Sequence, residues 1–211
     1  MTAQIDDRFS YKGNEYCLAG ISEGELFDPE SLGVKPVGAC TACWRGYLAV
    51  FGILDGRLIV RDLHVSLFPD SVDLLLDTEE PEDPGEALGP EINGVKPARH
   101  DPEEEDCDWF DNHYFNIAHR LDYTGGLLLA DGFIEELYVH MGFHPAWKYR
   151  TVLELVFENG RLVREHDRSE RLAKFREEFM NASAEAGPDR TPTEDEVSEF
   201  VRDAFDRSYG M

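Results

Sequence analysis

The chain lacks several features that would define a functional class at once. It contains no Gly-x-Gly-x-x-Gly, no Gly-x-x-x-x-Gly-Lys-Ser/Thr and no Gly-x-Ser-x-Gly motif, so neither a phosphate-binding loop nor a serine nucleophile elbow is indicated. No segment approaches the run of about 18 to 20 apolar residues that a membrane-spanning helix needs. The first residues include Asp6, Asp7 and Arg8, where a signal peptide would be apolar. We therefore expect a cytoplasmic protein without a membrane span.

Cysteine is also scarce. Four cysteines in 211 residues, without an export signal, favour free thiols in a reducing compartment. Cys40 and Cys43 have the spacing of redox and zinc motifs. However, an apolar run typical of a strand follows them instead of a helix, and the remaining thiols, Cys17 and Cys107, are isolated in the sequence. The pattern favours buried, unreactive thiols, with zinc and a redox pair as alternatives, and we predict no metal and no cofactor.

Basic residues are few compared with acidic ones. The chain has 44 acidic and 20 basic residues, a net charge of −24, and residues 73–111 alone carry 15 acids against Lys96 and Arg99. Nucleic-acid binding needs a basic stripe, and because none is present we expect no nucleic-acid partner. A run of acids is usually a solvated surface, but it can also steer a basic protein partner. The densest run supplies the candidate partner-binding residues: Glu103, Glu104, Glu105 and Asp106.

Turn signals and aromatic residues indicate a β-rich fold. Thirteen Phe, eight Tyr and three Trp are enough to form a core. Asp-Gly and Asn-Gly pairs favour the type I′ turns of hairpins. We expect such turns at Asp55-Gly56, between strands 47–54 and 57–65, and at Asn159-Gly160, between strands 151–158 and 161–166. A weaker hairpin signal is Lys12-Gly13-Asn14. Asp131-Gly132 predicts a further turn into a strand over 133–139, although that segment also fits a helical face.

Helical signals gather near the C-terminus. Asp167 and Glu170 form a capping pair that predicts a helix to about residue 182, with an apolar face made by Leu172, Phe175, Phe179 and Met180. Residues 181–192 have the composition of a linker, and 193–211 that of an amphipathic helix, which could dock on the protein's own sheet or on a partner. We expect an α+β fold with one β-rich domain over 1–180, an acidic insertion over about 73–111, and C-terminal helices.

A short repeat suggests an internal duplication. The tetrapeptide of residues 33–36, Gly-Val-Lys-Pro, recurs at 94–97, and each copy precedes a cysteine close to a tryptophan. Residues 61–65 also resemble residues 135–139. We interpret these matches as two related β-rich units packed as one domain, and we expect its hairpin-rich sheet or sheets to be antiparallel. A ligand cleft would then be expected at the seam between the units, since pockets favour such interfaces.

Six residues are candidates for ligand binding. An arginine beside an aromatic ring can hold a carboxylate or phosphate while the ring stacks on a ligand, and a loop that carries two histidines and a tryptophan can line a pocket. Alternatively, these side chains fill the core or form ion pairs with the many acids. The six candidates are Trp44, Arg45, Arg120, His140, His144 and Trp147.

The sequence supports two functional hypotheses. The first is a non-catalytic acidic protein that binds a macromolecular partner, for example an immunity-type inhibitor that covers a basic toxin. It depends on the charge concentrated over 73–111 and on the lack of a catalytic motif. The second is an enzyme or small-molecule-binding protein with a pocket between the two β units, lined by the six candidates. The two differ in whether those side chains converge on a cleft.

Overall fold

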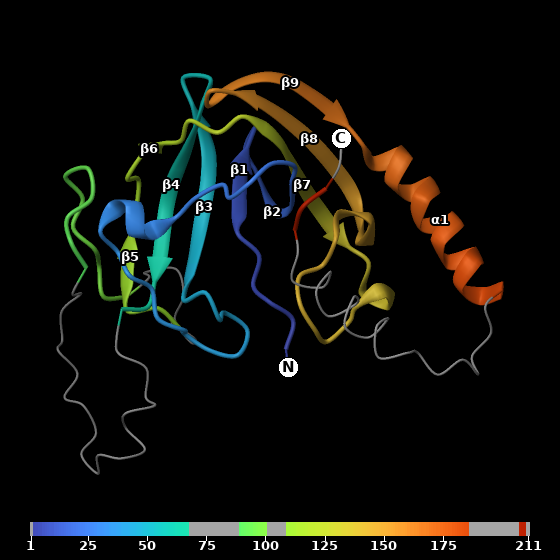
Figure 1. Cartoon of the computed structure of the whole chain (residues 1–211), viewed down its shortest axis with the longest axis horizontal. Coiled ribbons are helices and arrows are strands. Elements are labelled where there is room, and N and C mark those ends of the chain that lie inside the picture. Colours follow the sequence, from blue (N-terminus) through green and yellow to red (C-terminus); the bar gives the residue numbers. More distant parts are fainter. Residues whose placement is uncertain (1, 68–88, 101–108, 186–206, 210–211) are drawn as a thin grey trace, which may run out of the picture.

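The computed structural model describes residues 2–67, 89–100, 109–185 and 207–209 (Figure 1). Within these ranges the fold is a mixed sheet of nine strands with one α-helix, which agrees with the α+β class. The strands are β1 (Arg8–Tyr11), β2 (Asn14–Ile21), β3 (Tyr47–Leu54), β4 (Arg57–Val65), β5 (Asn112–Tyr114), β6 (His119–Arg120), β7 (Gly125–Phe133), β8 (Tyr149–Glu158) and β9 (Arg161–Asp167). The helices are α1 (Ser169–Glu185) and the short 3₁₀ helices η1 (Pro29–Leu32), η3 (Glu135–Leu137) and η4 (Ala146–Lys148).

The three predicted hairpins β1–β2, β3–β4 and β8–β9 are all present. In each turn both central residues have positive φ: 51° and 81° at Lys12-Gly13, 52° and 73° at Asp55-Gly56, and 48° and 73° at Asn159-Gly160. Type I′ turns require this geometry because their twist matches that of the flanking strands. Local turn chemistry therefore determined these three hairpins.

The turn predicted at Asp131-Gly132 is wrong, as are both structures predicted for the segment after it. Strand β7 continues through these residues and pairs with β8 from Gly125 opposite Phe157 to Phe133 opposite Tyr149. Of the two turn candidates only Gly132 has a positive φ, 68°, so no type I′ turn forms. Beyond the strand come η3 and a loop. The long-range pairing with β8 outweighs the local preference for a turn.

The strand pairings close on themselves. The order is β3–β1–β2–β7–β8–β9–β4, and β4 pairs again with β3, while β5 and β6 add to β4. All pairings are antiparallel except β1–β3, which is parallel, contrary to the all-antiparallel expectation. The largest apolar cluster takes side chains from β1, β2, β3, β4, β5, β7 and β8, and its fully buried members include Phe9, Phe51, Leu127 and Phe157.

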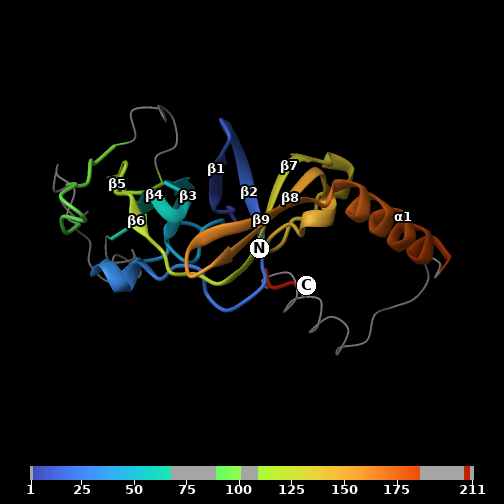
Figure 2. The same cartoon turned by 90° about the horizontal axis from the view of Figure 1, so that it is seen from above.

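A second, smaller cluster covers the other face of β2, β7 and β8. Its sheet residues include Ala19, Leu128 and Val152, which alternate with residues of the main core. Helix α1 lies at this side of the molecule, beyond β8 (Figures 1 and 2), and Leu172 packs against the cluster. The described C-terminal residues reach the same face through Tyr209. This face carries the pocket described below.

Helix α1 begins as the sequence predicted. The Ser169 amide donates to Asp167 Oδ1 at 2.9 Å, so Asp167 caps the helix. The predicted apolar face is only partly buried, since the side chains after Leu172 remain nearly half exposed: Phe175, Phe179 and Met180. The helix also continues to Glu185, through the first residues of the expected linker. The rest of that linker and residues 193–206 of the predicted last helix lie outside the described residues. For residues 207–209 the helix prediction is wrong, because they are extended and Ser208 forms a parallel bridge with Ile21.

The duplication is not confirmed. Residues 61–65 belong to strand β4, whereas the matching residues 135–139 begin with the 3₁₀ helix η3. The two Gly-Val-Lys-Pro copies also differ, because Gly33 caps η1 while Gly94 lies in a turn closed by hydrogen bonds between Ile92 and Val95. The acidic segment is described only at 89–100 and 109–111, so Glu103, Glu104, Glu105 and Asp106 lie outside the described residues. In the described part of the chain no helix is long and apolar enough to cross a membrane.

Candidate functional site

The described C-terminal residues dock beside the end of β2. The Ile21 amide donates to the Arg207 carbonyl at 2.8 Å, and the Tyr209 amide donates to the Ile21 carbonyl at 3.2 Å. The Tyr209 ring lies over Gly20, where an added Cβ would be 2.9 Å from a ring carbon. Tyr209 also donates from its hydroxyl to the buried Glu154 at 3.3 Å. These contacts bring Arg207 and Tyr209 next to residues almost 200 positions earlier in the chain.

A buried carboxylate joins two arginines here. Arg45 donates to Asp7 from Nη1 at 2.6 Å and from Nη2 at 2.8 Å, and Arg207 donates to Asp7 Oδ2 from both Nη atoms at 3.1 Å. The Ala49 amide adds a bond of 2.9 Å to Asp7 Oδ1. Burial opposes ionisation of Asp7, but the charges of Arg45 and Arg207 hold its pKa below the usual value. Arg45 therefore forms an ion pair, the alternative that the sequence left open.

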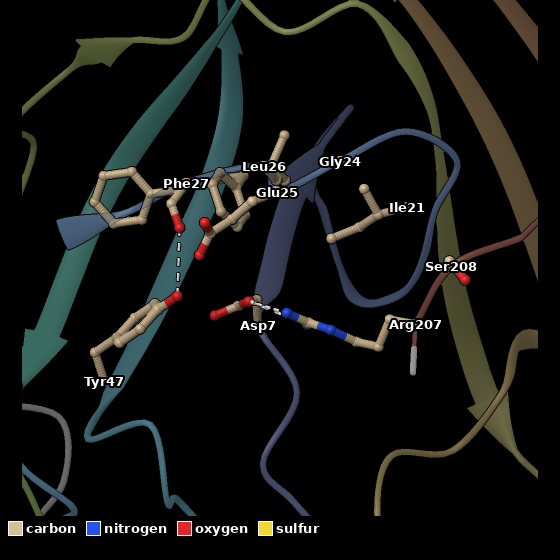
Figure 3. A pocket seen from close by; sticks show the side chains of 10 residues that line it. Asp7, Ile21, Gly24, Glu25, Leu26, Phe27, Tyr47, Arg207 and Ser208 are labelled. Carbon is tan, nitrogen blue, oxygen red and sulfur yellow. Dashed lines mark hydrogen bonds and ion pairs between the residues drawn. The ribbon is translucent and has the colours of Figure 1, made fainter. Parts of the chain in front are cut away.

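A first pocket lies in front of this network (Figure 3). It has a volume of about 330 Å³, and its polar lining includes Asp7, Glu25, Tyr47 and Arg207. The Tyr47 hydroxyl donates to the Phe27 carbonyl at 3.4 Å, and Figure 3 shows Arg207 pointing at Asp7. Asp7, Tyr47 and Arg207 in this pocket thus already have partners within the protein.

Asp6 differs from its neighbour Asp7. Its Oδ2 accepts a bond of 3.4 Å from the Tyr149 hydroxyl, while its Oδ1 is buried and has no hydrogen-bond partner among the described residues. Burial, supported by the negative charge of Asp7 and opposed by Arg207, raises the pKa of Asp6 to about 7. Burial, together with the charge of Asp6, also raises the pKa of Cys17. Asp6 therefore keeps its proton to a much higher pH than an exposed aspartate does.

A second pocket lies on the outer face of β2 and β7. Its volume is about 310 Å³, and it is closed by loop 139–148, by α1 and by residues 207–209. The walls are mainly apolar, and the polar groups come from His144, Lys148, Arg207, Ser208 and Tyr209. The apolar wall residues are Ala19, Leu128, Val139, Met141, Phe143, Pro145, Ala146, Trp147 and Leu172. We call it the His144–Lys148 pocket.

The loop that closes this pocket is held at both ends. The Gln4 amide donates to the Gly142 carbonyl at 2.8 Å, and the Ile134 amide donates to the Lys148 carbonyl at 2.9 Å. Phe143 packs close to both arginines of the Asp7 network, with its ring centroid 5.7 Å from Arg45 Cζ and 4.7 Å from Arg207 Cζ. The Asp7 network and the pocket are therefore parts of one packed unit.

His144 and Lys148 are buried side by side in the pocket. They are 8% and 7% exposed, and Lys148 Nζ lies 3.5 Å from His144 Nδ1. The imidazole packs on Phe133 with ring centroids 4.7 Å apart. Its other nitrogen, Nε2, is buried without a hydrogen-bond partner in the described part of the chain. Burial and the charge of Lys148 lower the pKa of His144 to about 4, and burial lowers the pKa of Lys148.

The structure brings only two of the six predicted ligand-binding residues, His144 and Trp147, into this pocket. His140 is exposed, and its Nδ1 lies 3.0 Å from the Tyr138 hydroxyl. Trp44 is 51% exposed and does not fill the core. Arg120 is exposed on β6, opposite Ile59 of β4. Arg120 therefore lies away from Trp44 and Arg45. Arg45 comes just before Tyr47 at the start of β3, whereas Ile59, the partner of Arg120, pairs with Gly52 near the other end of β3.

The sequence analysis missed four of the five polar residues of the pocket: Lys148, Arg207, Ser208 and Tyr209. Lys148 carried a signal, since it follows Trp147 within an aromatic run and is four residues from His144. Arg207, Ser208 and Tyr209 carried none, because their position depends on pairing with Ile21. The cleft was expected at a seam between two duplicated units. The pocket instead lies between one sheet face, a loop and α1.

The cysteine pair gives no support to redox chemistry. Cys40 and Cys43 close a turn through a backbone bond of 3.0 Å, and the Cys43 thiol donates to the Tyr47 carbonyl at 3.3 Å. Burial raises the pKa of Cys43, whereas a reactive thiol needs a lowered one. Cys17, Cys40 and Cys43 are free, and Cys107 lies outside the described residues. Within the described ranges no three metal-ligating side chains are grouped.

No protein-family model, curated protein or solved structure matches this chain significantly.

Proposed function

We propose that the protein binds a small molecule with a polar, anionic end and an apolar body in the His144–Lys148 pocket. The observation that carries this proposal is the buried His144 Nε2, which has no partner among the described residues, beside a buried lysine. Buried polar groups nearly always have hydrogen-bond partners, and each unpaired one costs about 1–3 kcal/mol. A ligand that bonds to these groups would remove that cost.

The charge of the pocket supports an anionic ligand. Lys148 forms no ion pair within the described residues, and Arg207 lines the same wall. Arg45 and Arg207 share the single carboxylate of Asp7, so these three residues together carry a net charge of +1. The neighbouring Asp6 does not cancel this charge while it is protonated. By contrast, Asp7, Tyr47 and Arg207 in the pocket in front of Asp7 are already paired. The unpaired groups thus favour the His144–Lys148 pocket as the binding site.

Its size and walls define the rest of the ligand. Small-molecule sites span about 300–1,000 Å³ and are mostly apolar with a few placed polar groups. At about 310 Å³ this pocket is at the small end of that range. Trp147, Phe143 and Leu128 offer apolar and aromatic surface. We therefore propose a compact ligand with a ring or a short chain and a single carboxylate.

Calorimetric titration with benzoate and hexanoate tests the proposal, with benzyl alcohol as the uncharged counterpart of benzoate. Both carboxylates are expected to bind, and benzyl alcohol to bind more weakly. Lys148→Met keeps much of the side-chain volume but removes the charge, and it should weaken benzoate binding about tenfold or more, since hydrogen bonds to charged groups contribute about 1.5–3 kcal/mol.

The matched control is Lys174→Met. Lys174 is an exposed lysine on α1 that pairs with Glu170 at 3.0 Å, so its loss should leave benzoate binding unchanged. Circular dichroism of both variants checks that the fold is kept. The proposal is refuted if neither carboxylate binds at millimolar concentration, or if the two lysine variants bind benzoate equally well.

The concentrated negative charge favours a second candidate function. Fifteen of the 44 acids fall in residues 73–111, and this supports an acidic protein that captures a basic macromolecular partner, such as a toxin. An oligolysine peptide titrated across a salt series is a suitable probe. Neutralising Glu103, Glu104, Glu105 and Asp106 as their amides should weaken binding more than neutralising four acids of the tail. Equal effects of the two variants would contradict a dedicated binding surface.

Either function fits a cytoplasmic protein. We propose this compartment because the three described cysteines are all free, although Cys40 and Cys43 lie in one turn. Free thiols persist in a reducing compartment. Localisation of a tagged full-length chain by cell fractionation tests this expectation.

A further inference from the structure

The chain has five lysines, and the structure describes all of them. Lys12, Lys35, Lys96 and Lys174 are exposed, whereas Lys148 is buried and lines a pocket. Lys12 and Lys174 form ion pairs with Glu165 and Glu170. The buried lysine instead contacts an imidazole and lies 5.6 Å from the Trp147 ring. An ion pair would hold a lysine in its protonated form, and Lys148 has no described carboxylate to do so.

We propose that Lys148 forms an imine with a small aldehyde or ketone that also carries a carboxylate, with His144 as the residue that moves the proton. This inference rests on the proposed function, since it gives the ligand of the His144–Lys148 pocket a reactive carbonyl group. Lysines that form imines are typically desolvated in apolar pockets, because the free amine is the nucleophile. The apolar walls around Lys148 provide that environment, and its lowered pKa agrees with it.

The chemical step is balanced without any further reagent. Lys148 Nζ forms a bond to the carbonyl carbon, and the carbonyl oxygen becomes the hydroxyl of a carbinolamine. The C–O bond then breaks, water leaves with a proton taken from the nitrogen, and a C=N bond remains. A proton must therefore move from nitrogen to oxygen. His144 Nδ1 lies 3.5 Å from Nζ, and its pKa of about 4 keeps the ring neutral and able to accept that proton.

The rest of the pocket fits a carboxylate-bearing carbonyl compound. Nε2 of His144 has no partner among the described residues, so it can carry the ring hydrogen of the neutral imidazole, which leaves Nδ1 free to accept the proton from Lys148 Nζ. Arg207 lines the same pocket; both its Nη atoms donate to Asp7, so it contributes positive charge toward the carboxylate and not a free pair of donors. The apolar body would lie against Leu128 and Trp147. These groups assign the substrate class of the pocket as a small oxo acid.

Reductive trapping in the intact protein tests this inference. Glyoxylate and 4-carboxybenzaldehyde, which differ in the spacing between carbonyl carbon and carboxylate, are each added with sodium cyanoborohydride. The hydride reduces an imine to a stable secondary amine, and peptide mass spectrometry then locates the added group. We expect Lys148 to be labelled roughly tenfold or more faster than the exposed Lys174, and benzoate to slow labelling at Lys148 alone.

Two variants separate the roles of the residues. Lys148→Arg keeps a cation and should abolish the fast labelling. His144→Gln keeps a hydrogen-bonding side chain of similar reach and should slow labelling of Lys148 about tenfold or more, in line with general acid–base catalysis, and should change its pH profile. An effect of packing alone would lower the rate equally at every pH, and this outcome would refute the role of His144.

The labelling pattern in the unmodified protein decides the inference even if a variant misfolds. Labelling spread over the four exposed lysines, with Lys148 no faster than they are, would overturn it. If benzoate still binds in that case, the imine is refuted while the binding pocket stands. If neither aldehyde nor benzoate engages the pocket, both proposals fail.

Discussion

Replacement of Asp6 by asparagine should make the protein more stable at neutral and alkaline pH. The pKa of Asp6 is raised from 3.8 to about 7 in the folded state, mainly by burial, and the groups around it are Arg207, Asp7, Arg45 and Tyr149. Between these two pKa values the folded protein holds a proton that the unfolded chain has lost. Stability therefore falls as pH rises from about 4 to about 7.

The magnitude follows from the same pKa values. Each pKa unit corresponds to about 1.4 kcal/mol, so the rise from 3.8 to about 7 costs the folded state up to about 4 kcal/mol once Asp6 is ionised. About half of this cost, roughly 2 kcal/mol, develops above pH 5.5. This part of the cost can be measured away from the isoelectric point, which is about 4.5. Asp6→Asn cannot ionise and can still accept the hydrogen bond from Tyr149, so its stability should lack this contribution.

Urea unfolding followed by tryptophan fluorescence, at intervals from pH 5.5 to 8.5, measures the effect. The difference in unfolding free energy between Asp6→Asn and the natural protein cancels the other carboxylates, and it should grow with pH and level off above pH 7. Parallel curves for the two proteins would refute the reasoning.

Asp7→Asn is the matched control, one residue away. The pKa of Asp7 is lowered in the folded state, so its charge stabilises the fold above its unfolded pKa. Loss of the charge leaves the largely buried Arg45 and Arg207, whose side chains are 19% and 16% exposed, without their anionic partner, which typically costs about 3–5 kcal/mol. The two neighbouring substitutions should therefore change stability at pH 8 in opposite directions.

Two further predictions concern stability away from the pocket, both measured by urea unfolding. Gly160→Ala should destabilise the protein by about 3 kcal/mol or more, because Gly160 has a φ of 73° and an added Cβ would lie 2.1 Å from the Leu121 carbonyl oxygen. Gly56 has the same φ, but an added Cβ there would meet open space. Gly56→Ala should therefore cost only about 1 kcal/mol. Equal losses would remove the clash as the cause. Arg168→Met should cost about 3–5 kcal/mol, because it leaves the 3% exposed Glu154 without its ion pair, and a loss below 1 kcal/mol would show that Tyr209 alone satisfies it.

The features that could be predicted from the sequence are those determined within a few neighbouring residues. The Asp55-Gly56 and Asn159-Gly160 turns need only two residues that tolerate positive φ, and Asp167 caps α1 through an amide two positions later. Asp131-Gly132 shows the limit of this reasoning. It has equally good turn chemistry, yet pairing along the whole of β7 and β8 keeps it within a strand.

The candidate site was harder to predict because its parts are distant in the sequence. His144 and Trp147 were found from their loop, but the Asp7 network joins residues 7, 45 and 207 through side chains, and no local pattern encodes that contact. The same holds for the parallel pairing of β1 with β3, which a hairpin pattern does not imply. Lys148 could have been found, since it is a lysine within an otherwise aromatic and apolar segment.

The sign of the salt dependence separates the two proposed functions. A protein of net charge −24 repels an anion at long range, and salt screens that repulsion beyond about 10 Å at 0.1 M. The attraction between a carboxylate and the buried Lys148 acts at contact and is screened much less. Benzoate binding should therefore stay constant or strengthen as ionic strength rises from about 10 to 150 mM. Oligolysine binding to the acidic segment should weaken over the same range. Benzoate binding that weakens in parallel with oligolysine binding would mean that the carboxylate is held by exposed charges, not by the buried pair.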